Sequence, residues 1–286
     1  TSTARAQTIT VDLNGGSSNA GTLWTERTSA SSGLWSGVTY GNGLFVAVSA
    51  TSSAQSIMTS PDGITWTLRT ATTSNTAWQS ITYGNGLFVA VACGITSTTC
   101  NATAGNRVMT SPDGITWTPR ADAADNGWQS VTYGNGLFVA VSDTGTGNRV
   151  MRSVDGINWA TSTSAADNQW TSITYGNGLF VAIASSGTGN RVMSSPDGIT
   201  WTSRTSAGDN AWQEVTYGNG LFVAVACGMS ATACNATAGN RVMTSPDGIT
   251  WTARAYAADN PWNSVTYGNG LFVAVSATSS AQSIMT

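Results

Sequence analysis

One eight-residue block, Tyr-Gly-Asn-Gly-Leu-Phe-Val-Ala, occurs six times in this chain of 286 residues. The copies begin at Tyr40, Tyr83, Tyr133, Tyr175, Tyr217 and Tyr267. A strand-rich period of about 40 to 50 residues is typical of radial or stacked arrays in which each repeat is one structural unit. The 12 Trp and 6 Phe follow the same period. These aromatic side chains are therefore predicted to belong to a repeated framework.

Each repeat carries the pattern of four short strands. In the second repeat the strands are predicted at 78–83, 87–91, 107–110 and 115–118. The first alternates and is rich in β-branched and aromatic residues, and the second is apolar throughout, as in a strand buried on both faces. Gly84-Asn-Gly86 suits a tight hairpin, and Ser111-Pro-Asp-Gly114 suits a turn. The predicted fold is all-β, a six-bladed β-propeller of four-stranded antiparallel blades.

The turn before the fourth strand has a distinctive sequence. Ser-Pro-Asp-Gly-Ile-Thr-Trp stands at 60–66, 111–117, 195–201 and 245–251, with a variant at 153–159. It resembles the Asp-box of sialidase-type (BNR) propellers, shortened by one residue between Asp and Gly. The resemblance covers 18–286 and implies a propeller with the box between the third and fourth strands. The repeats are also similar to those of phage tail and bacterial surface proteins. Fold alone does not fix an activity.

The two ends of the repeat array complement each other. The sixth repeat stops at Thr286, before its turn and fourth strand, and Gly21–Thr28 aligns with Gly63–Thr70. The N-terminal strand is therefore predicted to complete and close the last blade, with Trp24 in the same sheet as Met285. This gives two units, a tail over 1–17 and the propeller over 18–286.

Composition limits the partners. Charged residues make up 9% of the chain, the net charge is −3, and His is absent. The sequence contains no basic cluster that would indicate nucleic-acid binding. It also contains no apolar run long enough to cross a membrane. No cofactor is predicted.

The four cysteines form two pairs with the same spacing, Cys93 with Cys100 and Cys227 with Cys234. Both pairs fall in the loop between the second and third strands, in repeats that lie opposite each other in a six-fold ring. A zinc site would need four ligands, so the two pairs would have to meet across the molecule. Two local disulfides are favoured over free thiols, which predicts an extracellular or cell-surface location. Asn101 and Asn235 begin glycosylation acceptor patterns.

The same variable loops share a predicted face with the connections between blades, the usual binding face of a propeller. The connections carry Asp-Asn at 125–126, 167–168, 209–210 and 259–260. A ring of such carboxylates could hold Ca²⁺, but stabilisation of turns is favoured and no metal is predicted. Two sets of Arg also repeat, and we expect structural pairing of these with Asp. They are Arg107, Arg149, Arg191 and Arg241, and Arg69, Arg120, Arg204 and Arg254.

Catalysis has little support in the sequence. A glycosidase needs two carboxyl groups in contrasting environments, and a sialidase would also need a unique arginine cluster and a Tyr–Glu pair. Glu214 and Glu26 are the two glutamates, and Tyr256 is the one tyrosine outside the repeated block. We therefore predict that the chain is not an enzyme, with a sialidase-like glycosidase as a remote alternative.

The tail contains one strand-like segment without a counterpart in the repeats: Gln7, Thr8, Ile9, Thr10, Val11, Asp12 and Leu13. An extended segment of this kind can add to an exposed sheet edge of another copy. The sequence thus predicts a structural or adhesive subunit that self-associates, as a filament or surface assembly. The alternative is a lectin-like module that binds cell-surface glycan on the loop face.

Overall fold

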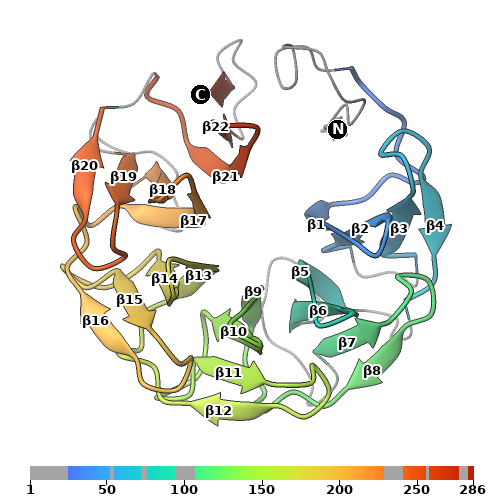
Figure 1. Ribbon diagram of the computed structural model, residues 1–286, viewed down its shortest axis with the longest axis horizontal. Coiled ribbons are helices and arrows are strands. Elements are labelled where there is room, and N and C mark those ends of the chain that lie inside the picture. The colour runs from blue at the N-terminus through green and yellow to red at the C-terminus, as the bar shows by residue number, and fades with distance from the viewer. Residues whose placement is uncertain are drawn as a thin grey trace.

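The computed structural model describes residues 25–51, 55–71, 76–94, 107–228, 241–255, 258–276 and 283–286. These residues contain strands and turns, arranged as six small sheets around a common axis (Figure 1). The predicted all-β, six-bladed propeller is confirmed. The tail over 1–17 and its boundary with the propeller lie outside the described residues.

Each blade has the strand order of the sequence, from the axis outward. The first blade consists of β1 (Trp35–Gly41), β2 (Leu44–Ser49), β3 (Ile57–Ser60) and β4 (Thr67–Arg69). The second consists of β5 (Ala77–Gly84), β6 (Leu87–Gly94), β7 (Val108–Ser111) and β8 (Thr118–Arg120). The third consists of β9 (Trp128–Gly134), β10 (Leu137–Ser142), β11 (Val150–Ser153) and β12 (Ala160–Ser162).

The fourth blade consists of β13 (Trp170–Gly176), β14 (Leu179–Ala184), β15 (Val192–Ser195) and β16 (Thr202–Arg204). The fifth consists of β17 (Ala211–Gly218), β18 (Leu221–Gly228), β19 (Val242–Ser245) and β20 (Thr252–Arg254). The sixth consists of β21 (Trp262–Gly268), β22 (Leu271–Ser276) and β23 (Ile284–Met285). All neighbouring strands are antiparallel, as in the pair of β9 with β10.

The Asn-Gly pair of the repeated block forms the hairpin between the first two strands of every blade. In the third blade, Asn135 has φ 49° and Gly136 has φ 76°. Two consecutive positive φ values define a type I′ turn, whose twist matches that of the flanking strands. The hairpin sets the register, so Tyr133 pairs with Phe138. Their ring centroids are 4.6 Å apart.

The Ser-Pro-Asp-Gly segment is a turn held by its carboxylate. The backbone N–H groups of Ile115 and Thr116 donate to Asp113 Oδ1 at 2.8 and 2.7 Å, and Ser111 Oγ donates to the same oxygen at 2.8 Å. The hydrogen bond from Thr116, with those from Ile115 and Ser111, lowers the pKa of Asp113 to about 2. Trp117 Nε1 donates to the carbonyl of Gly114 at 3.1 Å. The Asp therefore orders the entry to the fourth strand.

The hydrophobic core lies between blades. Five clusters occur among the described residues, and each straddles two consecutive blades. One cluster joins Val89, Val91 and Val108 of the second blade to Trp128 and Phe138 of the third. The inner-strand Trp is fully buried in five blades, at Trp78, Trp128, Trp170, Trp212 and Trp262. Each blade therefore depends on its neighbour to cover its apolar face.

A tyrosine and a glycine contact each other across each of these five interfaces. A Cβ added to Gly134 would lie 2.1 Å from Cγ of Tyr175, far inside van der Waals contact. The same distance, 2.1 Å, recurs for Gly41 with Tyr83, Gly84 with Tyr133, Gly176 with Tyr217, and Gly218 with Tyr267. At these positions only a glycine leaves room for the tyrosine ring of the next blade to approach the backbone. We refer to this contact as the Tyr–Gly contact.

The described part of the sixth blade is a sheet of three strands, β21 to β23. Trp24, predicted to pair in that sheet, lies outside the described residues, so this part of the closure stays a prediction. Residues 25–28 are described and form no strand. Instead Glu26, Arg27 and Thr28 border a cleft of about 440 Å³ with Ile64 and Trp66 of the first blade. At the interface of the fourth and fifth blades, a cleft of about 400 Å³ is bordered by the equivalent residues 203–206 and 249–251.

The Tyr–Gly contact makes a sharp prediction for stability. Gly134→Ala forces the ring of Tyr175 or the backbone of β9 to move, and overpacking of this kind costs about 3 kcal/mol. The thermal midpoint of unfolding should fall by roughly 5–10 °C. Gly208→Ala is the control, because its nearest neighbour would be Asn210 Nδ2 at 3.8 Å. Equal midpoints for the two variants would contradict the role given to Gly134.

Candidate functional site: the loop face

The loops between second and third strands lie on the same face as the connections between blades, as predicted. We call this surface the loop face. The N–H of Gly127, in a connection, donates to Thr144 Oγ1 at 2.7 Å in the loop of the third blade. The N–H of Gln169 likewise donates to Ser186 Oγ at 2.8 Å in the fourth blade. The loops are thus bonded to the connections at equivalent positions of two adjacent blades.

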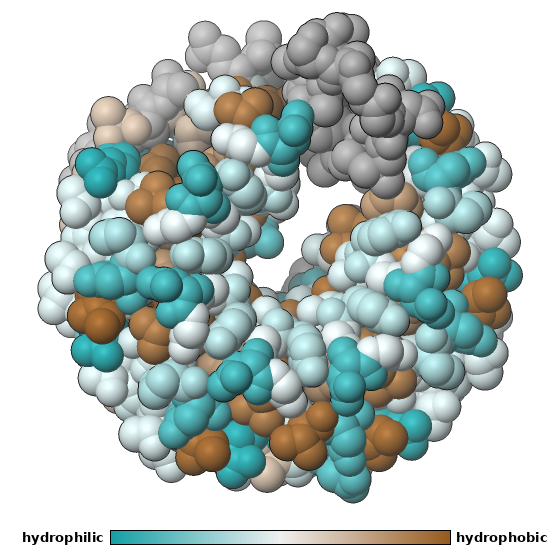
Figure 2. All heavy atoms as spheres, in the orientation of Figure 1, coloured by the Kyte–Doolittle hydropathy of each residue, from teal (hydrophilic) through white to brown (hydrophobic). Residues whose placement is uncertain are grey.

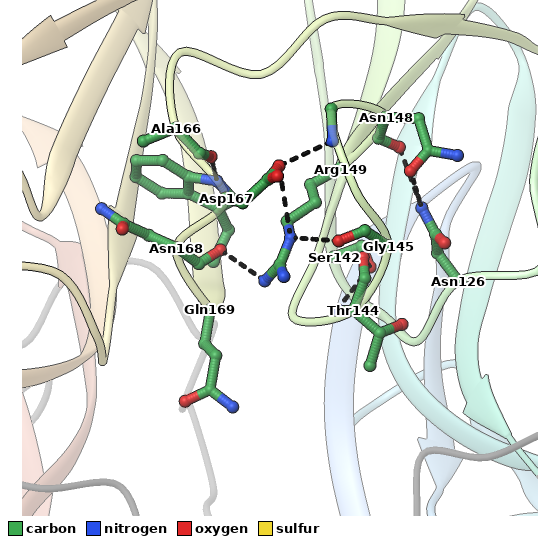
Figure 3. Close-up of polar contacts among 12 residues, drawn as sticks. Asn126, Ser142, Thr144, Gly145, Asn148, Arg149, Ala166, Asp167, Asn168 and Gln169 are labelled. Atoms are coloured by element: carbon green, nitrogen blue, oxygen red, sulfur yellow. Dashed lines mark hydrogen bonds and ion pairs between the residues drawn. The ribbon is translucent and has the colours of Figure 1, made fainter.

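Arg149 is the centre of the network that ties one loop to the next connection (Figure 3). Its Nε lies 3.7 Å from Asp167 Oδ1 and donates to the carbonyl of Gly145 at 2.8 Å. Its NH1 group donates to the carbonyls of Asp143 and Asn168 at 2.6 and 3.0 Å. The guanidinium therefore links the third blade to the chain that enters the fourth, which is a structural task.

The same pair recurs in later blades, so the predicted pairing with Asp is confirmed for Arg149, Arg191 and Arg241. Arg191 Nε lies 3.7 Å from Asp209 Oδ1, and Arg241 Nε lies 2.8 Å from Asp259 Oδ1. Burial lowers the pKa of Arg191, and the charge of Asp209 opposes that shift. Within the described ranges, no three His, Cys, Asp or Glu side chains come together as a metal site. The connection carboxylates instead bond to the framework.

Asn126 and Asn168 contribute more than the sequence indicated. Asn126 Nδ2 donates to the carbonyl of Asn148 at 2.9 Å, and Asn168 Nδ2 donates to that of Asn190 at 2.9 Å. Both side chains pack on a loop glycine with positive φ, Gly145 in the first case. The repeated Asp-Asn of the connections was the sequence feature that could have indicated this role. The Asp of this pair was assigned a turn or cation role, whereas the Asn fixes the loop of the blade that follows the connection.

The second set of Arg binds hydroxyl groups within its own blade, so the expected pairing with Asp is wrong for these residues. Arg120 Nε donates to Thr110 Oγ1 at 3.0 Å, and the counterparts in the first, fourth and fifth blades bond in the same way. The third blade exchanges the two side chains between strands. There Arg152 Nε on β11 donates to Ser162 Oγ at 3.1 Å on β12. The hydrogen bond is kept although its two partners change places, which identifies it as framework.

Two cysteines are described, at the ends of β6 and β18. Cys93 and Cys227 are both buried and disulfide-bonded. Gln79 Nε2 contacts Cys93 Sγ at 3.4 Å, and Gln213 Nε2 contacts Cys227 Sγ at 3.4 Å. Cys100, Cys234, Asn101 and Asn235 lie outside the described residues. The pairings Cys93–Cys100 and Cys227–Cys234 and the glycosylation sites therefore stay predictions.

Glu214 occupies a position that holds serine in earlier blades. Ser80, Ser130 and Ser172 each accept a hydrogen bond from a backbone N–H of the next blade at 3.2 Å. Glu214 Oε2 accepts from the N–H of Val265 at the same distance. Burial raises the pKa of Glu214, partly offset by hydrogen bonds from Ser264 and Val265. Glu214 thus makes an inter-blade bond, while Tyr256, the other residue noted for catalysis, lies outside the described residues.

One further carboxyl on the loop face has an altered affinity for protons. Burial raises the pKa of Asp143, and a hydrogen bond from Gln129 and the charge of Arg149 act against this increase.

The face drawn in Figure 2 is hollowed at the axis, and its apolar residues are scattered among polar ones. Among the residues that the structure describes, no helix is long and apolar enough to span a bilayer. What the described loop face offers a ligand is a polar surface of Asn, Thr, Ser and partly exposed Asp.

The comparisons with known proteins identify the fold. No family model matches the sequence, and no curated protein matches it. Virginiamycin B lyase from Staphylococcus aureus is similar in structure, with TM-score 0.66 and 15% identity over 88% of this chain and 83% of the other. YCF48 bound to D1 peptide has TM-score 0.53 and 13% identity over 82% and 71%. A chain of the nidogen/laminin complex has TM-score 0.52 and 11% identity over 78% and 81%.

At these identities the likeness defines a class by fold alone: the chain is a β-propeller. The resemblance to sialidase-type propellers is supported at that level and no finer one. An enzyme and proteins solved with a bound peptide or protein share the architecture. The function must therefore be argued from the residues of this chain.

The raised pKa of Glu214 predicts a pH-dependent effect on stability. The folded protein holds this proton more tightly than the unfolded chain, whose glutamate titrates near the ordinary value of 4.5. Stability contributed by the neutral form is present below that pH and is lost as pH rises through the folded-state pKa. Glu214→Gln should therefore be more stable than the original chain at pH 7 and equal to it below about pH 4.

Denaturant unfolding across this pH range measures the difference. Glu26→Gln is the control, because it removes the same charge from an exposed position. An advantage for the original chain that grows with pH would instead mean that the ionised Glu214 is stabilised by its partners.

Proposed function

We propose that this chain is a non-catalytic structural or adhesive subunit that works outside the cell. The observation that carries the proposal is the use of its charged groups. Arg149, Arg191 and Arg241 pair with connection carboxylates, and Glu214 accepts a backbone N–H from the next blade. A catalytic acid or base needs an ionisable group that can reach a substrate. Groups committed to holding the blades together serve a scaffold instead.

The location follows from the disulfides. Cys93 and Cys227 are disulfide-bonded at the base of the two long loops. Structural disulfides persist in oxidising environments such as the extracellular space. Low charge and a surface of Ser, Thr, Asn and Gly also suit a subunit that is packed in an assembly.

Self-association is proposed to use the tail. In Gln7–Leu13 the apolar residues Ile9, Val11 and Leu13 alternate with polar ones. One edge of such a strand can pair with a sheet edge of another copy while its apolar side packs on the surface. Since this contact joins two different surfaces, it need not close, and it would build a filament.

Deletion of residues 1–15 tests this function. The full chain should form particles of increasing mass in light scattering and filaments in electron microscopy, and the deleted chain should remain a monomer. Two double variants give a finer test. Ile9→Asp with Val11→Asp should abolish assembly. Thr8→Asp with Thr10→Asp is the control, because it adds the same charge on the opposite side of the strand. Assembly of the deleted chain, or a monomeric full chain at high concentration, would refute the proposal.

A glycan-binding module is the second candidate. It is favoured by the repetition of the same polar surface on adjacent blades, where the side chains of Asp167 and Asp209 are 42% and 39% exposed. Carboxylates beside amide and hydroxyl groups suit sugar hydroxyls. Deletion of residues 1–15 separates the two functions, because glycan binding on the loop face should survive it.

A further inference from the structure

The first and sixth blades each leave uncovered the face that every other described interface buries. At five interfaces the inner-strand Val or Ile packs on the preceding blade and is 3–7% exposed, at Ile81, Val131, Ile173, Val215 and Val265. The counterpart in the first blade, Val38, is 60% exposed. Tyr40 is 53% exposed, and Trp35 is only partly buried although its five counterparts are fully buried. This surface of β1 is called the Tyr40 face.

The sixth blade carries the complementary surface. Leu271 and Ile284 are 45% and 52% exposed, and Val273 and Val275 are only partly buried. No described atom lies within 4 Å of a Cβ added to Gly268, where the other five glycines meet a tyrosine ring. We call this surface the Gly268 face. It has the hollow that receives a tyrosine, and no tyrosine occupies it among the described residues.

Exposed apolar faces of this kind mark interaction sites, and here the internal interfaces define the occupant. We propose that the Tyr40 face and the Gly268 face together hold one further blade of the same repeat type. Its inner strand ends in a Tyr that fills the hollow of Gly268, and the Gly that follows receives the ring of Tyr40. Both contacts continue the Tyr–Gly contact already made five times.

Residues 26–29 mark the outer position of the blade that would precede the first. They border the first blade as residues 203–206 of the fourth blade border the fifth. The outer position of a blade preceding the first is therefore occupied by the chain's own segment. In the described residues β23 pairs with β22, and 25–28 form no strand beside it. What remains to be supplied is the set of inner strands.

A second full copy does not fit the same place. The six blades already take up most of a turn around the axis, and the first and sixth do not adjoin (Figure 1). A copy docked with the same rotation from blade to blade would run into the first one. A single blade continues the array and covers both faces.

Hydroxyl-radical labelling with mass spectrometry tests the inference on the intact chain. Val38 and Tyr40 should be oxidised several-fold more than Val131 and Tyr133, independently of protein concentration. Equal protection of Val38 and Val131 at low concentration would mean that the ring closes on itself and would overturn the proposal. Protection that appears only at high concentration would identify a second copy as the occupant and would overturn it as well.

The occupant is tested by lengthening the full chain. A copy of residues 153–194, which lacks cysteine, is appended after Thr286 and supplies an outer strand for the sixth blade and three inner strands. Labelling of Val38 and Tyr40 should fall to the level of Val131 and Tyr133, and a second appended copy should bring no further protection. The matched control carries Gly176→Ala in the appended copy, which puts a Cβ where the ring of Tyr40 would lie, and should leave Tyr40 labelled more strongly. Unchanged labelling of Tyr40 in the lengthened chain would contradict the proposal.

This inference is independent of the proposed function. The tail deletion is read out by assembly and the labelling experiments by oxidation of Val38 and Tyr40, so the two proposals can fail separately.

Discussion

The contact between one blade and the next is the interaction on which this structure depends. A single blade is a small sheet with apolar side chains on both faces, and it cannot bury them alone. The Tyr ring of each following blade rests on the backbone of a glycine, and the inner-strand Trp fills the space beside it. An aromatic side chain buries about 150–250 Å². Repetition of these contacts, rather than any one sheet, provides the stability of the array.

The same dependence explains how the polar groups are used. Arg149 and its counterparts and the serines of the inner strands join one blade to the next. Asn126 and Asn168 bond the connection that enters a blade to the loop of that blade. These bonds lie in the repeated positions, which leaves the variable loops free to differ. It also explains why the edges of the array matter. The first and sixth blades carry the same apolar faces as the other blades. Where the neighbouring blade is missing, these apolar side chains are exposed.

The framework could be predicted from the sequence because its signals are repeated and local. Asn-Gly at 135–136 fixes a hairpin, the Ser-Pro-Asp-Gly turn places the fourth strand, and the apolar second strand indicates burial on both faces. The site was less predictable, because its contacts join residues of different segments, 10 to 22 positions apart. The bond of Asn126 to Asn148 and the exchange of Arg152 with Ser162 depend on the packed position of two strands. Whether the apolar faces of the first and last blades are covered depends on the geometry of the whole ring. No local sequence pattern indicates that geometry.

Amide hydrogen exchange of the intact chain tests the central claim most directly. If stability comes from blade-to-blade contacts, the inner strands β9 and β13, with neighbours on both sides, should exchange most slowly. Protection should decline toward β1 and β21, each of which has one neighbour among the described blades. Uniform protection of all six inner strands would show that the first and sixth blades are covered as fully as the rest, and would contradict the account.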